Sequence, residues 1–232
     1  MTIKLVIVLL VSILLINIPV FGKTTAAKEK KDLSADIAYV HTGLVNIQAV
    51  DPSIKVQLVY STTDNFLKSD AYGDLETAYL QKDAAVMLAN AQRLLQKRMP
   101  GYSLIVYDAA RPRSVQRVMW NLVKGTKVED FVANPENGSV HNYGCAVDVT
   151  ILDDKDKLLD MGTEFDFFGD LARTDIEDKL FAEAKLTRRQ YDNRILLRQV
   201  MTKSGFQIIE EEWWHFDAFP RKVAKRKYKI IE

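Results

Sequence analysis

Apolar and polar residues alternate in several short stretches of the chain, and this period of two predicts β-strands. The first such region covers residues 37–60 and contains a turn at Asp51-Pro52. A second is the short apolar run at residues 103–109, which has the composition of a buried strand. Residues 206–219 form a further strand-rich run. In residues 146–151 the apolar side chains share one face of the predicted strand, namely Val147, Val149 and Ile151.

Other segments repeat their apolar side chains every three to four residues, which is the period of an amphipathic helix. The clearest covers residues 76–99 and ends at Pro100-Gly101. Its core-facing stripe consists of Leu80, Ala84, Leu88, Ala91 and Leu95. Residues 114–125 and 187–203 each open with a hydroxyl side chain that can cap a helix. The basic residues 221–229 are then expected to form a solvated C-terminal tail.

The composition favours one compact domain. No Gly-, Ser- or Pro-rich linker divides the 232 residues, so residues 37–232 are expected to fold together, after a polar, Lys-rich and flexible lead-in at residues 23–36. Lys and Arg number 32 against 31 Asp and Glu, and this balance excludes a basic surface for nucleic acid. Cys145 is the single cysteine, so it cannot form an internal disulfide and is expected to be a small core residue.

Residues 1–22 have the layout of a secretory signal peptide. Lys4 precedes the nearly unbroken apolar run of residues 5–22, and small residues suitable for cleavage follow. An uncleaved membrane anchor is the alternative, because the run approaches the roughly 20 residues that span a bilayer. Asn17 and Pro19 near its end favour the signal peptide. We therefore expect export, to the periplasm, with membrane anchoring only if the run is retained.

Two of the three histidines lie near carboxylates at spacings that a metal site can use. His141, Asp148 and His215 offer two imidazoles and one carboxylate, which can hold Zn²⁺ and leave a fourth position for water. Glu212, three residues before a ligand, is then the general base. Residues three apart on a regular strand face opposite ways, so we expect the chain to bend at Trp213-Trp214.

Spacing alone leaves other interpretations of these residues open. Two histidines and one carboxylate also describe a ferrous oxygenase site, and an arrangement without a catalytic metal is as well supported as zinc hydrolysis. Asp148 in a buried strand needs a cationic partner, either a metal or an arginine. Arg111, which Pro112 places in extended backbone at a strand exit, either faces a cleft or pairs with Asp108. His41, beside a turn, is left out of the site.

Residues 160–168 alternate carboxylates with aromatic side chains, which is unusual for a loop. We interpret this segment as a pocket wall that offers a carboxylate to a cationic group of the substrate. The alternative is an aromatic cluster with solvated acids.

The order of these segments resembles a known family. The pattern Ser-x-His-x-x-Gly-x-Ala-x-Asp at residues 139–148, together with Glu-Trp-Trp-His at 212–215, is similar to that of the D-alanyl-D-alanine dipeptidases, the zinc enzymes of the vancomycin-resistance type. Further segments resemble the family in the same order and extend the likeness over residues 40–217: YSTTDNF at 60–66, YDAARPR at 107–113, MGTEFD at 161–166 and SGF at 204–206.

The resemblance implies a fold and an activity. The fold is α+β, a single domain in which helices flank a central, mainly antiparallel sheet and a zinc site lies in a closed cleft. One Zn²⁺ per chain is bound by His141, Asp148 and His215. The reaction is hydrolysis of the dipeptide D-Ala-D-Ala to two D-alanines, so the expected partner is a small dipeptide.

The resemblance also assigns the remaining site residues. Glu212 is the catalytic base and returns the proton to the leaving amine. Arg111 stabilises the oxyanion of the tetrahedral intermediate. Ser139 and Asp166 hold the ammonium group of the substrate, which explains selectivity for a dipeptide over longer peptides.

Export distinguishes this chain from the resistance enzymes, which deplete cytoplasmic D-Ala-D-Ala, and favours degradation or recycling of wall-derived dipeptide. A zinc D,D-carboxypeptidase that trims peptidoglycan stem peptides is the first alternative, because its metal motif is similar. Its longer substrate requires an open cleft, whereas the aromatic and acidic segment at residues 160–168 favours a closed pocket. A non-catalytic wall-binding module is the second, although a structural zinc more often has four protein ligands.

Overall fold

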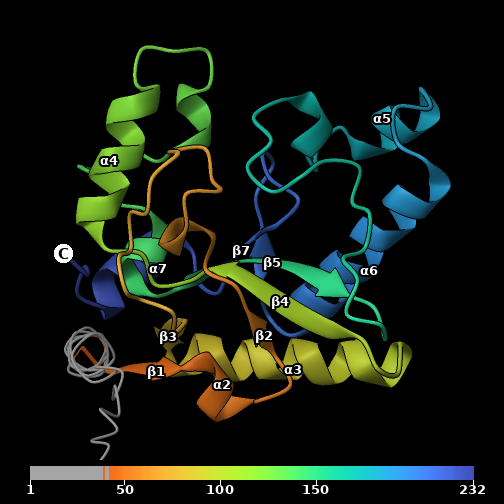
Figure 1. Ribbon diagram of the computed structural model, residues 1–232, viewed down its shortest axis with the longest axis horizontal. Helices are drawn as coiled ribbons and strands as arrows, with labels where there is room; N and C mark the ends of the chain where they lie inside the picture. Colours follow the sequence, from red (N-terminus) through yellow and green to blue (C-terminus); the bar gives the residue numbers. More distant parts are fainter. Residues whose placement is uncertain (1–38, 40–41) are drawn as a thin grey trace, which may run out of the picture.

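The computed structural model describes Tyr39 and residues 42–232 (Figure 1). The signal peptide expected at residues 1–22 and the lead-in at 23–36 lie outside the described residues, and so does His41. Within the described part of the chain, none of the helices combines the length and the hydropathy that a bilayer-spanning segment needs.

A five-stranded sheet with the order β2-β4-β5-β7-β6 forms the centre of the described structure. Its strands are β2 (Lys55–Val56), β4 (Ser103–Asp108), β5 (Ala146–Leu152), β6 (Gln207–Ile208) and β7 (His215–Asp217). Only the β2–β4 pairing is parallel; the others are antiparallel. A separate antiparallel pair joins β1 (Leu44–Asn46) to β3 (Tyr79–Gln81). The fold is therefore α+β with a mainly antiparallel sheet, as expected.

Helices surround this sheet, and α3 runs along one of its faces (Figure 1). The α-helices are α2 (Ile47–Val50), α3 (Lys82–Arg98), α4 (Arg113–Val123), α5 (Glu177–Ala182), α6 (Arg188–Lys203) and α7 (Arg221–Lys227). Short 3₁₀ turns are η1 (Val59–Ser61), η2 (Glu129–Phe131), η3 (Val140–Tyr143) and η4 (Asp170–Ala172). The capping box expected at Thr187 is present and opens α6.

The two faces of β5 have different tasks. One face joins the main core with α3 and α6 through Val147, Val149 and Ile151. The other face carries Asp148 and Thr150, and both are buried although they are polar. Val59 of η1 and the loop residue Phe165 cover part of this second face by packing on Ile105, Tyr107 and Leu152. Loops therefore cover the polar face of the sheet, and the candidate site lies between this face and the loops.

The N-terminal third departs from the predicted elements. Residues 47–50 form α2 instead of a strand, because Asn46 caps them by accepting a hydrogen bond from the Gln48 N–H. The predicted helix at residues 76–99 starts only at Lys82, because residues 79–81 pair with β1. In both places a local pattern was overruled, once by a cap and once by strand pairing.

The C-terminal third contains both a confirmed and a wrong prediction. Trp213 and Trp214 form a turn before β7, as expected. Residues 221–229 are not a solvated tail: α7 follows Pro220 and buries Ala224. Basic side chains occupy its exposed face, and Ala224 is the one buried residue of this helix. Cys145 is fully buried in a small cluster with Ala224, as expected for a core cysteine.

Candidate active site

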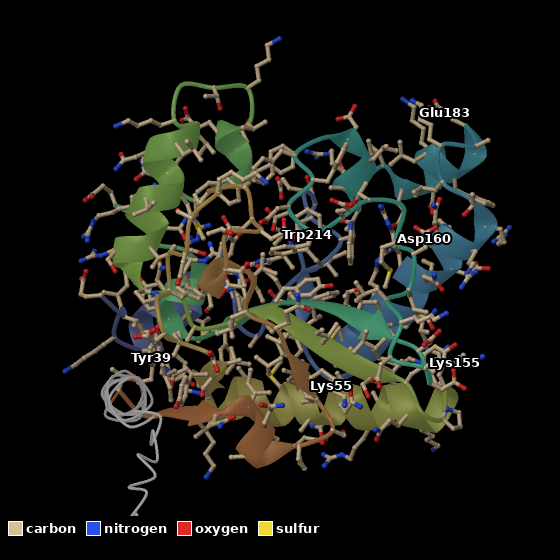
Figure 2. All side chains as sticks on the ribbon, viewed as in Figure 1. Tyr39, Lys55, Lys155, Asp160, Glu183 and Trp214 are labelled. Atoms are coloured by element: carbon tan, nitrogen blue, oxygen red, sulfur yellow. The ribbon has the colours of Figure 1, made fainter. Side chains whose placement is uncertain are left out.

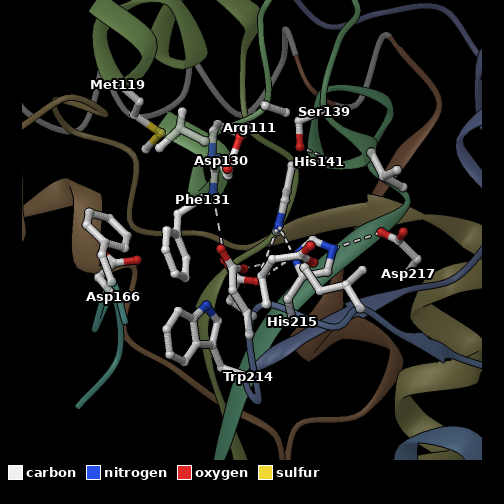
Figure 3. A pocket seen from close by; sticks show the side chains of 18 of the residues that line it. Arg111, Met119, Asp130, Phe131, Ser139, His141, Asp166, Trp214, His215 and Asp217 are labelled. Atoms are coloured by element: carbon white, nitrogen blue, oxygen red, sulfur yellow. Dashed lines mark hydrogen bonds and ion pairs between the residues drawn. The ribbon is translucent and has the colours of Figure 1, made fainter. Parts of the chain in front are cut away.

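Three potential metal ligands converge where β5 and β7 pair beside η3 (Figure 3). Asp148 on β5 lies directly opposite His215 on β7, so both side chains leave the sheet on the same face. His141 reaches the same point from η3, because Gly144 at φ +64° turns the chain back into β5. One ligand atom from each residue lies within 4.8 Å of the others, and all three residues are buried.

Hydrogen bonds behind the two imidazoles determine which nitrogen faces the cluster. His141 Nδ1 lies 2.7 Å from the carbonyl oxygen of Ala109, which can only accept, so Nδ1 carries the proton and Nε2 presents a lone pair. His215 Nε2 lies 2.9 Å from Asp217 Oδ1, so Nε2 donates there and Nδ1 faces the cluster. Carbonyl and carboxylate partners of this kind typically orient histidines that bind a metal.

The three inward-facing atoms form a triangle that fits zinc. His141 Nε2 lies 3.1 Å from His215 Nδ1 and 3.3 Å from Asp148 Oδ1. His215 Nδ1 lies 3.0 Å from the same carboxylate oxygen. Ligands at roughly 2.0–2.1 Å from a tetrahedral Zn²⁺ are about 3.3 Å apart. Three lone pairs at this spacing need a cation among them, and the triangle has the size of one face of a zinc tetrahedron.

The charged groups of the cluster also shift one another's pKa values. Burial by itself lowers the pKa of His215, but Asp217 and Asp148 outweigh it and raise that pKa well above its usual range. Burial opposes ionisation of Asp148, yet His141 and His215 hold its pKa below the usual range. The cluster therefore favours one or more positive charges, and metal binding competes with proton binding there.

Glu212 lies at the edge of the cluster. The turn at Trp213-Trp214 brings its Oε2 to 3.8 Å from His215 Nδ1, and its side chain is 13% exposed. Burial raises the pKa of Glu212 to about 8, while His215 opposes this shift and Asp148 adds to it. A carboxylate at the edge of three ligands has the position of a general base.

Arg111 is held beside the cluster by two neighbours. Its Nε–H donates to Asp108 Oδ2 at 2.7 Å and its Nη1–H donates to Gln116 Oε1 at 2.9 Å, while Nη2 also pairs with Asp108. A guanidinium has five N–H donors, so within the described structure one remains on each terminal nitrogen. Nη2 lies 3.6 Å from Asp148 Oδ2. Arg111 therefore combines the two alternatives from the sequence: it forms a salt bridge with Asp108 and it also faces the cleft.

Asp166 lines the same cavity, apart from the ligand cluster (Figure 3). The Tyr60 hydroxyl lies 3.1 and 2.9 Å from its two carboxylate oxygens and can donate to either. Burial raises the pKa of Asp166 to about 8, and the hydrogen bond from Tyr60 opposes that shift. Asp166 also has a left-handed backbone, with φ +60°, which aspartate tolerates better than most residues.

Ser139 has a structural task that the sequence did not reveal. It caps η3: its backbone N–H donates to Asn142 Oδ1 at 2.7 Å, and its Oγ accepts from the His141 N–H at 3.4 Å. The cap uses only the acceptor capacity of the hydroxyl, so its proton remains available to a ligand in the cavity.

All of the predicted site residues line one cavity of about 250 Å³: Arg111, Ser139, His141, Asp148, Asp166, Glu212 and His215. Ligand pockets typically measure roughly 300–1,000 Å³, so this cavity suits a small ligand. Two of the lining residues, Asp166 and Phe168, belong to residues 160–168, which agrees with the interpretation of this segment as a pocket wall.

The sequence analysis missed residues that position the others. Asp217 orients His215, and its signal was the spacing His-x-Asp, which places both side chains on one face of a strand. Gln116 orients Arg111 and donates from its own amide to the carbonyl of Ala133 at 2.8 Å. No sequence signal marked Gln116, because a polar residue in an amphipathic helix is usually solvated.

Known proteins similar to this chain point to one family. The family model described as D-Ala-D-Ala dipeptidase matches residues 40–231. The D-alanyl-D-alanine dipeptidase of Escherichia coli (strain K12) is 31% identical over 177 residues, which cover 76% of this chain and 84% of that protein. The D-alanyl-D-alanine dipeptidase of Enterococcus faecalis (strain V583) is 30% identical, with 68% and 82% covered.

A solved structure, the LdcB LD-carboxypeptidase, aligns with a TM-score of 0.42 at 22% identity, covering 80% of this chain and 72% of that chain. A likeness this low carries no argument. The family model and the sequence relatives agree with the resemblance expected from the motifs, and they show that the chain belongs to the D-Ala-D-Ala dipeptidase family of metallopeptidases.

Proposed function

We propose that the protein hydrolyses the free dipeptide D-Ala-D-Ala to two D-alanines, with Zn²⁺ held by His141, Asp148 and His215. The observation that carries this proposal is the triangle of three lone-pair donors, with both imidazole tautomers determined by outer hydrogen bonds. Bound zinc would supply a Lewis acid that polarises a carbonyl and acidifies water.

Glu212 would then transfer the proton, and Arg111 would stabilise the negative charge of the transition state. Glu212 takes a proton from the attacking water and delivers it to the leaving amine, and its position beside His215 suits this role. Nη2 of Arg111 lies 3.6 Å from Asp148 Oδ2 and has one N–H that Asp108 leaves unused, which can stabilise a peptide oxygen that gains negative charge in the transition state.

Asp166 and Ser139 would bind the ammonium group of the dipeptide. Asp166 supplies the counter-charge, and Tyr60 keeps its carboxylate oriented. An acylated peptide lacks that ammonium and would leave the partly buried carboxylate unpaired, which is costly. The free dipeptide is therefore the preferred substrate, ahead of stem peptides of the cell wall.

Export would direct this activity to dipeptide released from the wall, for degradation or recycling. The support for export is the apolar run at residues 5–22 behind Lys4. Fractionation of cells that express the full chain, with N-terminal sequencing of the product, tests it. Finding the protein in the cytoplasm with residues 1–22 retained would contradict this role without affecting the proposed chemistry.

The decisive experiment measures amine release by purified residues 23–232 from D-Ala-D-Ala and from an acylated D-Ala-D-Ala peptide, with chelator and with zinc added back. We expect zinc-dependent hydrolysis of the free dipeptide alone. Hydrolysis of the acylated peptide alone would make the protein a carboxypeptidase, and hydrolysis of neither would favour a wall-binding module.

A further inference from the structure

A second cavity adjoins the candidate active site on the same face of the sheet. It has a volume of about 750 Å³ and shares Phe66 and Asp166 with the first cavity. Asp148 belongs to the first cavity and Thr150, two residues further along β5, to the second. Residues two apart on a strand face the same side, so the two cavities are neighbouring sections of one trough beneath the loops.

Phe165 separates the two sections. It lines the second cavity, where its ring lies 5.2 Å from that of Tyr107. On its other side its ring contacts two residues that line only the first cavity, at 6.2 Å from Tyr60 and 5.4 Å from Trp214. The benzyl group therefore lies between the two sections, and Phe66 and Asp166 line both of them.

Polar and charged side chains line the second section. Thr150 is 3% exposed, and its hydroxyl has no hydrogen-bond partner among the described residues. Such a group normally marks a place for a ligand or a water. The rim carries Asp64 and Glu164 in addition to the shared Asp166, with Lys68 as a cation. A peptide group beside Thr150 and an ammonium group near these acids would suit this lining.

We propose that Phe165 determines the length of the substrate by closing the trough after the dipeptide position. The inference rests on the proposed hydrolysis of D-Ala-D-Ala. With the benzyl group removed, the trough accepts a tripeptide with a free amino terminus, whose additional peptide group lies at Thr150 and whose ammonium lies among the acids of the second section. In the wild-type protein that additional residue collides with Phe165.

The test compares D-Ala-D-Ala with Gly-D-Ala-D-Ala as substrates of the zinc-loaded wild-type protein and of Phe165→Ala. The quantity measured is kcat/KM for the tripeptide divided by kcat/KM for the dipeptide, which corrects for any general loss of activity. We expect this ratio to rise at least about tenfold in Phe165→Ala. Phe165→Leu, which keeps most of the volume, should change it less than about threefold.

Thr150→Val provides a second, independent variant because Thr150 lines only the second cavity. In the Phe165→Ala background it should lower the ratio roughly two- to tenfold, as the loss of one hydrogen bond predicts. Circular dichroism and thermal unfolding establish that each variant is folded, and Phe165→Val replaces Phe165→Ala if the smaller side chain prevents folding.

An unchanged ratio in a folded Phe165→Ala or Phe165→Val protein would overturn the inference. So would a wild-type protein that hydrolyses both peptides equally well. Calorimetric binding of the two peptides to Glu212→Gln protein, with and without Phe165→Ala, asks the same question of binding alone. If hydrolysis fails while Phe165→Ala still admits the tripeptide, the proposed function is wrong and the role of Phe165 stands.

Discussion

A histidine binds a metal well only when its outer nitrogen is held, and Asp217 performs this task for His215. Asp217→Ala should weaken zinc binding about 10- to 100-fold, because the ring loses both its orientation and the negative charge behind it. Competition with a chromogenic chelator measures the affinity. Asp217→Asn should recover part of the loss, since it still accepts the Nε2 proton.

The matched control for this variant is Asp175→Ala, which removes a carboxylate from an ion pair with Arg173; neither residue belongs to the ligand cluster or lines its cavity. Its zinc affinity should equal that of the wild-type protein. Equal affinities in Asp217→Ala and Asp175→Ala would show that Asp217 does not position the ligand.

Glu212 has the opposite expected signature, because we place it in the proton transfer and outside the ligand set. Glu212→Gln keeps the shape of the side chain and removes the base, so kcat for D-Ala-D-Ala should fall about 10²- to 10⁴-fold. Zinc affinity should stay within about twofold, whereas His215→Ala should lose it. Full activity in Glu212→Gln would contradict the proposed role.

The pair of Tyr60 and Asp166 predicts a change in pH dependence. Burial raises the pKa of Asp166 to about 8, and the Tyr60 hydroxyl opposes that shift by donating to the charged form. Without the hydroxyl the pKa rises further. Because the ammonium of the substrate needs an ionised Asp166, the acid side of the kcat/KM profile should move to higher pH in Tyr60→Phe.

Tyr191→Phe is the control for this experiment. Tyr191 also donates its hydroxyl to a carboxylate, that of Asp178 at 2.7 Å, but on an exposed surface. Its pH profile should match that of the wild-type protein. A Tyr60→Phe profile that moves to lower pH, or does not move, would contradict the role of Asp166 in binding the ammonium group.

At the scale of elements, the C-terminal segment after α7 supports the site from behind. Ile231 is buried, and its N–H donates to the carbonyl of Asn142 in η3 while its carbonyl accepts from the Arg113 N–H. The amide of Asn142 in turn donates to the carbonyl of Arg111 at 2.9 Å. The chain end therefore connects η3 to the strand exit that carries Arg111.

Deletion of residues 230–232 should accordingly lower the melting temperature by about 5–10 °C, chiefly through the lost burial of Ile231. It should also lower kcat for the dipeptide, because η3 and Arg111 lose a shared support. Glu232→Gln removes only the ion pairs of the exposed Glu232 with Arg113 and Arg117 and should have little effect on either quantity. Equal melting temperatures for the two variants would mean that the segment contributes nothing.

At the scale of the whole molecule, the metal cluster and the main core are separate sources of stability. The core around α3 takes up Val147, Val149 and Phe216 from one face of β5 and β7, whereas Asp148 and His215 leave these strands on the other face. Chelation should therefore leave the protein folded, with a lower melting temperature. Zinc at a hundred times its dissociation constant should add about 2.7 kcal/mol, or on the order of 5–10 °C.

Calorimetry with chelator and with added zinc measures this shift, and His215→Ala should abolish it. Loss of the folded state on chelation would show that the cluster is a structural centre. A zinc-dependent shift of the same size in His215→Ala would place the bound zinc elsewhere on the protein.

Local patterns predicted the elements whose signal is confined to a few neighbouring residues. β4, β5 and α6 appear where alternation, helical period and the cap at Thr187 place them. The turn at Trp213-Trp214 followed from the demand that Glu212 and His215 meet. The predictions of a helix at residues 79–81 and of a solvated tail at residues 221–227 were wrong. The structure of these segments depends on β1 and on the surface beneath α7, and no local period reveals these partners.

By itself the sequence determined the family and the candidate ligands, since the rare histidines, their neighbouring acids and the order of motifs identify both. The tertiary structure alone decided the geometry that this chemistry requires: which nitrogen of each imidazole faces inward, how Asp217 and Gln116 hold their partners, and where Phe165 closes the trough. The physical reason is that these features are contacts between segments far apart in the chain, and only the packed fold brings them within hydrogen-bonding distance.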